Sequence, residues 1–470
     1  MKRAASLTAA AAYCGALIAL AVWSARSLHG TACQDVYFGY HQLQARSSTG
    51  LSLPVPVVQM CDNHTLPLLL VAFALAACAG WAIMLQHMPR KWIAALCACA
   101  GLGCAIAFPY VPSTDPYAYA LYGYEAAHGA TPYAASHART SDRSRALNEL
   151  YRLFPPGSSN RVANYGPVAV LQYQAVAFAA GDSLRRFVIF QRLCNAALLV
   201  LLAWLLRFVR PPQIGRTQAA WAAFHPLMLL ESVAFGHGDI LMLVLLCAAL
   251  AAYRKGLPAL CAALIVLGAE VRLVAALGLA VLFIELGRRD VRGLVRSVCA
   301  AAAAFAGTAA AAMVVYGKFT FGGAPAIEAF SSPAILAFDA FGVSMRHVGA
   351  GLVVQAAFGL ALIAALLRAR LYRYLPFAAL AALPIMRAWY CQWLVPMIAL
   401  DADRRVRVAA FAAASIAIIA EYPAMTAQSD APTWGVILSL QWLLPAAAAL
   451  LCEWKASPHS PAAAAASPST

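Results

Sequence analysis

Long apolar runs separated by short basic clusters are the feature that most restricts how this chain can fold. Runs such as residues 66–86 and 187–206 are long enough to cross a bilayer as helices, which takes about 20 residues. Of the 470 residues, 63% are apolar and 11% are charged, against roughly a quarter charged in ordinary soluble proteins. We therefore predict an all-α, polytopic transmembrane helical bundle with about 11–14 membrane helices, counting short broken hairpins.

The positions of the basic clusters predict the orientation of this bundle. Lys2 and Arg3 precede the first run, which we expect to be an uncleaved span with its N-terminus inside. The later basic clusters also fit the cytoplasmic side, and they lie at 90–91, 368–373 and 404–407. The formal net charge of +15 is thereby explained by topology. It indicates membrane lipids, and no nucleic acid, as partners.

This orientation predicts one multi-pass domain over residues 1–455 in the cell inner membrane. The tail 456–470 is rich in Ala, Pro and Ser and is predicted to be disordered. Cys33 and Cys61 lie in the first predicted loop, where they could form a disulfide with each other. The expected external loops, which form a periplasmic region, are residues 26–64, 111–185 and 316–348.

Three apolar segments do not fit a simple crossing. Residues 166–181 are short, so we expect a re-entrant or surface helix on the outside. Two longer blocks are interrupted by polar residues at 270–272 and 387–390, which indicates half-length helices that meet near the outer face.

Ionisable residues gather at the predicted external ends of the spans. Charges at membrane depth are costly and tend to mark functional sites. Their placement on one face favours an enzyme acting at the outer leaflet over a proton-coupled transporter. The residues are Asp115, Glu231, His237, Asp239, Glu270, Arg272 and Arg387.

Asp115 is the first candidate for chemistry. Tyr119 and Tyr122 follow it at helical spacing, which predicts a carboxylate in an aromatic pocket, able to act as general base toward a sugar hydroxyl. The alternative is that Asp115 caps a surface helix and the tyrosines form an interfacial belt.

A second group comprises Glu231, His237 and Asp239. Gly236 and Gly238 allow the backbone to turn tightly around His237, so the three side chains can converge. Such a cluster could bind a divalent metal as a cofactor. The alternative is that His237 and Asp239 satisfy each other.

The third group is basic. Arg272, and Arg387 beside Trp389 and Tyr390, are suited to binding phosphate. The alternative for both arginines is that they are snorkelling anchors.

These segments together are similar to a known family. Ser113-Thr-Asp115-Pro-Tyr117-Ala-Tyr119, Gly129-Ala-Thr-Pro132-Tyr133, Asn164-Tyr165-Gly166-Pro167 and His225-Pro226-Leu to Gly236-His237-Gly238-Asp239 resemble the GT-C superfamily of integral-membrane glycosyltransferases. Within it, the chain most resembles the polyprenyl-phosphate-mannose-dependent alpha-mannosyltransferases over residues 113–287. His225 replaces an Asn of the family pattern, Gly238 replaces the Asn of an H-N-D motif, and Arg272 replaces Lys.

The resemblance implies transfer of a sugar, which is mannose or another hexose or pentose, from a polyprenyl-phosphate donor to a lipid or glycan acceptor. It implies an active site facing the periplasm or exterior, with Asp115 as general base and Arg272 on the departing phosphate. The implied substrate-binding residues are Tyr119, Tyr133, Tyr165, Glu231, His237, Asp239, Arg272, Arg387, Trp389 and Tyr390.

Two other functions compete with a transferase. A transporter or flippase of lipid-linked saccharide would also use half-helices, aromatic residues and phosphate-binding arginines, and an inactive homologue could serve as a subunit in envelope assembly. Asp115 discriminates, because a transporter can lose this carboxylate and still bind its ligand, whereas a transferase loses turnover.

Overall fold

A computed structural model defines the fold, and all secondary structure in its described part is helical, which confirms the predicted all-α class. The chain divides into two compact units, 1–209 with 216–327, and 210–215 with 328–470. The structure describes residues 2–29, 65–87, 91–108, 115–134, 144–154, 162–318, 349–381 and 388–426.

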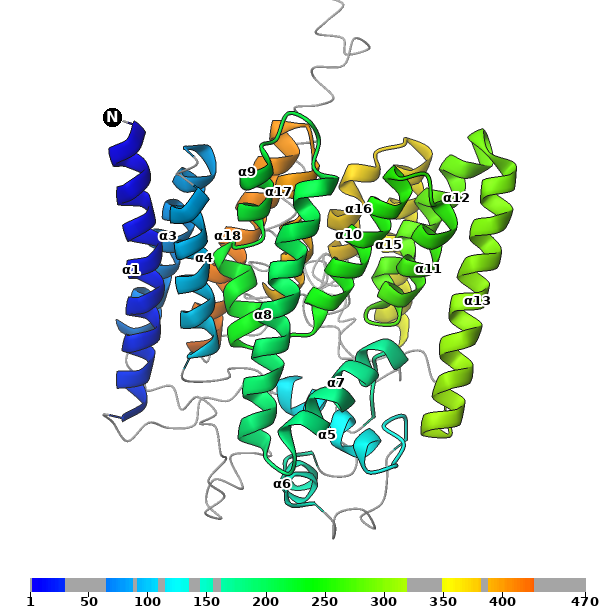
Figure 1. The fold of residues 1–470 in the computed structure, drawn as a ribbon, viewed down its shortest axis with the longest axis horizontal. Coiled ribbons are helices and arrows are strands. Elements are labelled where there is room, and N and C mark those ends of the chain that lie inside the picture. Colours follow the sequence, from blue (N-terminus) through cyan, green and yellow to red (C-terminus); the bar gives the residue numbers. More distant parts are fainter. Residues whose placement is uncertain are drawn as a thin grey trace, which may run out of the picture. The chain divides into compact units, whose positions relative to one another are not determined.

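The first unit contains most of the helices (Figure 1). They are α1 (Lys2–His29), α3 (Thr65–Gln86), α4 (Lys91–Ile106), α5 (Asp115–Ala127), α6 (Arg145–Leu153), α7 (Pro167–Ala180), α8 (Leu184–Val209), α9 (Arg216–Ala222), the π-helix η3 (Met228–Ala234), α10 (Asp239–Arg254), α11 (Pro258–Ala269), the 3-10 helix η4 (Leu273–Ala276), α12 (Leu277–Arg289) and α13 (Val291–Tyr316).

Two of these helices, α8 and α13, are long and apolar enough to cross a membrane, and α8 contains the run 187–206 that the sequence predicts as a span. A third candidate is the pair η3 and α10, which is bent by 115° at a short break. Seven further apolar helices of 10–17 residues lie in the described part of the chain. The described residues therefore supply fewer spans than the total of about 11–14, which stays a prediction.

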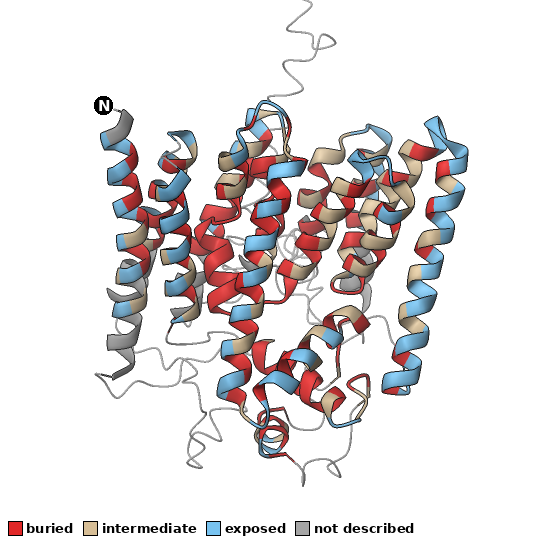
Figure 2. Ribbon diagram, viewed as in Figure 1, coloured by how far each residue is buried: buried red, intermediate tan, exposed pale blue. Residues whose placement is uncertain are grey.

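Sequential packing of the long helices builds the first unit. α1 packs on α3 and α4, α8 on α10, α10 on α11, and α11 on α13. The two long apolar helices differ in burial: half of the most apolar segment of α8 is buried, against 11% of that of α13. Figure 2 shows α13 as largely exposed or intermediate. An exposed apolar helix face fits a lipid environment.

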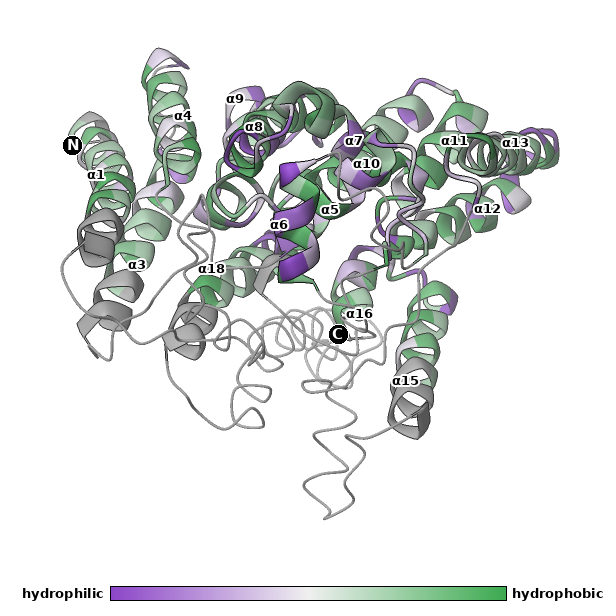
Figure 3. Cartoon of the chain, turned by 90° about the horizontal axis from the view of Figure 1, so that it is seen from below, coloured by the Kyte–Doolittle hydropathy of each residue, from purple (hydrophilic) through white to green (hydrophobic). Residues whose placement is uncertain are grey.

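Helices α5, α6 and α7 gather at one end of the first unit, where α5 and α7 pack against α8 (Figure 1). Pro167 starts α7 at a position where its missing N–H costs nothing, and Gly181 ends it with a φ of 57°. At 14 residues, α7 has the short length expected for 166–181. In Figure 3, α6 stands out as hydrophilic among these apolar helices.

The predicted interruption at 270–272 separates α11 from η4, where Glu270, Val271 and Arg272 stand between the two helices. The second unit contains α15 (Gly349–Arg368), η5 (Tyr372–Tyr374), α16 (Leu375–Ala381), η6 (Ala388–Leu394), α17 (Met397–Leu400) and α18 (Arg404–Thr426). Within this unit α18 packs on η6 and α17.

Several predictions fall outside the described residues. Most of the loops 26–64 and 316–348 lies there, and so do Cys33, Cys61 and the tail 456–470.

Candidate active site

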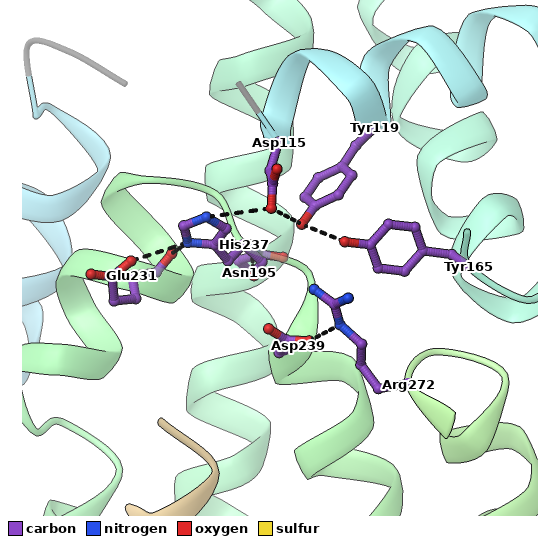
Figure 4. Close-up of polar contacts among 8 residues, drawn as sticks. All are labelled: Asp115, Tyr119, Tyr165, Asn195, Glu231, His237, Asp239 and Arg272. Carbon is purple, nitrogen blue, oxygen red and sulfur yellow. Dashed lines mark hydrogen bonds and ion pairs between the residues drawn. The ribbon is translucent and has the colours of Figure 1, made fainter. Parts of the chain in front are cut away.

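Asp115 is the first residue of α5, and Tyr119 follows it by one helical turn. The Tyr119 hydroxyl lies 3.5 Å from Asp115 Oδ2 and 3.0 Å from the hydroxyl of Tyr165. Asp115 begins α5 and faces buried tyrosines (Figure 4). Because every residue from Pro116 to Ala126 is buried, α5 is not the surface helix of the alternative interpretation.

Tyr173 of α7 completes this aromatic group, and sequence reasoning missed it. Its ring stacks on that of Tyr119 with 4.6 Å between centroids and 3° between planes. A Cβ at Gly238 would lie 2.5 Å from the Tyr173 hydroxyl, so the glycine makes room for the tyrosine. Gly238 has an ordinary φ of −79°, whereas the turn itself depends on Gly236 with a φ of 77°. The only sequence signal for Tyr173 was an aromatic residue in a run interpreted as a surface helix.

His237 connects two carboxylates. Its Nδ1 lies 3.1 Å from Glu231 Oε2, and its Nε2 faces Asp115 Oδ2 at 3.8 Å. Glu231 belongs to the π-helix η3, a distortion found frequently at functional sites. The side chains of His237 and Glu231 are 1% and 3% exposed, whereas that of Asp115 is 26% exposed. Asp115 is therefore the member of this trio that substrate can reach.

Asp239 forms an ion pair with Arg272, a partner that the alternative of a His237–Asp239 pair did not include. Arg272 Nε donates to Asp239 Oδ1 at 2.5 Å, and its guanidinium carbon lies 4.5 Å from the centroid of the Tyr165 ring. Arg272 is 17% exposed and Asp239 is fully buried. The arginine is thus held on one side by a carboxylate and on another by an aromatic face.

Asn195 of α8 fixes the backbone of the turn that carries His237. Its amide nitrogen donates to the carbonyl oxygens of Ser232 at 2.6 Å and His237 at 3.1 Å, while its side-chain oxygen accepts from Gln191 at 3.2 Å. Sequence reasoning missed this residue too. The available signal was an amide side chain within a predicted span, where polar residues are rare and tend to be functional.

The hydroxyls of Tyr119 and Tyr165 lie outside the candidate spans and stay neutral. Burial raises the pKa of both phenols well above the ordinary value of 10. Asp115 raises both pKa values further, and Arg272 opposes the rise. Both hydroxyls are therefore available as hydrogen-bond donors at neutral pH.

Of the four remaining predicted site residues, Tyr133 is the one that lies in the described part of the first unit. The Tyr133 ring packs against Tyr316 of α13, with 5.9 Å between centroids. Arg387 lies outside the described residues, and the side chain of Trp389 in η6 is not described. Tyr390 packs on Trp393 within the second unit, at 5.1 Å. Among the described residues, no three His, Cys, Asp or Glu side chains are grouped as ligands for a metal ion.

This chain is all-α, has apolar helices of membrane length and encloses a cluster of opposite charges. It belongs to the class of helical membrane proteins. The family model described as Alpha-(1->6)-mannopyranosyltransferase, N-terminal domain, matches residues 8–287. The chain belongs to this family, which makes it a glycosyltransferase of the mannosyltransferase type. No curated protein and no solved structure gives a significant match.

The match includes the whole cluster from Asp115 to Arg272. It also extends to residue 8, through helices in which the sequence alone had shown no specific resemblance.

His225 illustrates how a departure from the resembling pattern is accommodated. Its Nδ1 accepts a hydrogen bond from the backbone N–H of Leu227 at 3.1 Å. An Asn side chain makes the same bond to the backbone two residues ahead in an Asx-turn. The imidazole therefore supplies the turn-forming acceptor that the Asn of the pattern would supply.

Proposed function

We propose that the protein transfers mannose from a polyprenyl-phosphate donor to a hydroxyl of a lipid or glycan acceptor at the outer face of the inner membrane, with a GT-C-like architecture. One observation carries the proposal. Asp115 and Arg272 are the partly exposed charges of a buried cluster, and the Tyr119–Tyr165 hydrogen bond joins the two ends. A base and a phosphate-binding cation are what this transfer needs.

Asp115 acts as general base in this proposal. Its carboxylate takes the proton of the acceptor hydroxyl as that oxygen forms a bond to C1 of the mannose, and the bond between C1 and the phosphate oxygen breaks. The bonding pair goes to the phosphate oxygen, so the products are the glycosylated acceptor, polyprenyl phosphate and a protonated Asp115. His237, fixed by Glu231, lies beside the Asp115 carboxylate and orients it.

Arg272 stabilises the charge that develops on the departing phosphate. A planar guanidinium is suited to phosphate oxygens, and a fixed cation in an enclosed site needs no reorganisation when the charge appears. Asp239 holds Nε, and in Figure 4 the terminal nitrogens point toward the side of the cluster that carries Asp115 and Tyr119.

Mannose transfer tests the proposal directly. Purified protein in membrane lipid extract is given radiolabelled polyprenyl-phosphate mannose, with the glucose and arabinose donors in parallel, and Asp115→Asn is compared with wild type. Loss of a general base predicts a rate about 10²–10⁴-fold lower, with donor binding retained. Glu149→Gln is the matched control, because Glu149 pairs with the exposed Arg145 one helical turn before it, and such pairs have small energetic value.

Donor specificity and metal use are measured in the same assay. Transfer from the mannose donor alone supports the assigned sugar, and repetition with EDTA measures the dependence on a divalent metal. If no donor supports transfer while wild type and Asp115→Asn bind donor equally, the proposal is wrong, and the transporter or the inactive subunit takes its place.

A further inference from the structure

Glu270 is a buried carboxyl that the proposed chemistry does not use. It follows the last residue of α11 and precedes Arg272 by two positions, and its side chain lies outside every candidate span. The carboxyl accepts a hydrogen bond from the hydroxyl of Thr308 on α13 and another from the backbone N–H of Val168 in the first turn of α7. One side chain thus ties together three elements of the first unit.

The start of α7 also packs directly on the backbone of this junction. A Cβ at Gly166 would lie 2.5 Å from the carbonyl oxygen of Glu270 and 2.8 Å from its Cα. No side chain other than hydrogen fits there without a shift of backbone. Gly166 and Val168 therefore hold the segment that begins with Tyr165 against the segment that ends with Arg272.

The Tyr165–Arg272 contact depends on how these two segments sit. Tyr165 precedes α7 in a loop, and Arg272 precedes η4, a 3-10 helix of four residues. Such short elements have little hydrogen bonding of their own to fix a side chain. The contacts of Glu270 supply the missing restraint, because they join the two segments immediately beside the guanidinium and the ring.

We propose that Glu270 is a positioning residue that sets Arg272 against the Tyr165 ring, so that the guanidinium meets the departing phosphate. This inference rests on the proposed function. We call the hydrogen bonds of Glu270 with Thr308 and Val168 the clamp. The clamp requires an acceptor oxygen on residue 270: Thr308 donates to Oε1, while Oε2 is buried with no hydrogen-bond partner among the described residues. Burial raises the pKa of Glu270 to about 7, and Oε1 still accepts from Thr308 after Oε2 is protonated.

The variants separate the clamp from a general packing effect. Thr308→Val removes the donor and keeps the shape, whereas Thr308→Ser retains the donor. Glu270→Gln keeps the acceptor oxygen and Glu270→Ala removes it. Ser297→Ala is the matched control, because Ser297 is a buried hydroxyl on the same helix whose Oγ has no partner among the described residues.

Two measurements are made on each variant in lipid nanodiscs. The first is kcat and KM for transfer from polyprenyl-phosphate mannose. Loss of one positioning hydrogen bond is expected to lower kcat roughly tenfold, with a smaller change in KM, because charge on the leaving phosphate develops in the transition state. The second is hydrogen–deuterium exchange of the peptides around 162–170 and 268–276, which requires no activity.

The clamp predicts that Thr308→Val and Glu270→Ala raise deuterium uptake in both peptides together and lower kcat. Thr308→Ser, Glu270→Gln and Ser297→Ala should stay near wild type. Unchanged uptake in both peptides for Thr308→Val and Glu270→Ala overturns the inference, as does increased uptake with wild-type kcat. If wild type transfers no sugar yet the two peptides loosen together, the clamp stands as a structural device and the proposed function is what fails.

Discussion

Removal of the Arg272 charge is expected to destabilise the protein more than removal of the Asp239 charge. The two side chains form an ion pair with 2.5 Å between Nε and Oδ1. Arg272→Met leaves a carboxylate that is 0% exposed without its cation, and breaking a buried pair from one side costs about 3–5 kcal/mol. Asp239→Asn leaves a guanidinium that is 17% exposed and lies over the Tyr165 ring, so a smaller cost of about 1–3 kcal/mol is expected.

The double variant Asp239→Asn with Arg272→Met distinguishes structure from chemistry. It removes both charges together, so that neither charge is left buried without its partner. Stability should therefore return to within about 1–2 kcal/mol of wild type. Mannose transfer should stay as low as in Arg272→Met, because the double variant still lacks the cation that stabilises the leaving phosphate.

The assay is the free energy of unfolding in mixed detergent micelles, measured by titration with a denaturing detergent for wild type, both single variants and the double variant. Transfer is measured on the same preparations. A double variant whose cost equals the sum of the single costs would refute the reasoning, since uncoupled residues behave in that way. Recovered transfer in the double variant would refute the role of Arg272.

Four further substitutions have predicted effects. Asn195→Leu removes the donor from two buried carbonyl oxygens and should cost about 1–3 kcal/mol for each, measured by thermal unfolding. Gly123→Ala places a Cβ 2.4 Å from the backbone oxygen of Tyr173 and should cost about 1–3 kcal/mol by overpacking, whereas Gly103→Ala, with open space around it, should be neutral or better. Hydrogen bonds from the start of α6 outweigh burial and lower the pKa of Asp182, so its contribution to stability is present above about pH 4 and is lost as the pH falls through the lowered value. Asp182→Asn should flatten this acid dependence in unfolding measured from pH 5 downward; an unchanged profile contradicts the assignment.

The sequence by itself determined the features that depend on neighbours along the chain. The all-α class follows from apolar runs in which each helix satisfies its own backbone hydrogen bonds. The break between α11 and η4 falls at Glu270–Arg272 because polar side chains interrupt an apolar block there. Asp115 and Tyr119 meet because residues four apart share a helix face.

Only the tertiary structure decided which of these residues meet across the chain. Asp239 pairs with Arg272, which lies 33 residues further along the chain. Tyr173 stacks on Tyr119 because α5 and α7 cross closely where Gly123 has no side chain. Tyr133 shares the spacing of the motif but packs on Tyr316. Such pairings depend on helix crossings and on the close approach of backbones. Both follow from how helices distant in the sequence pack together, and the spacing of residues along one segment carries no information about that packing.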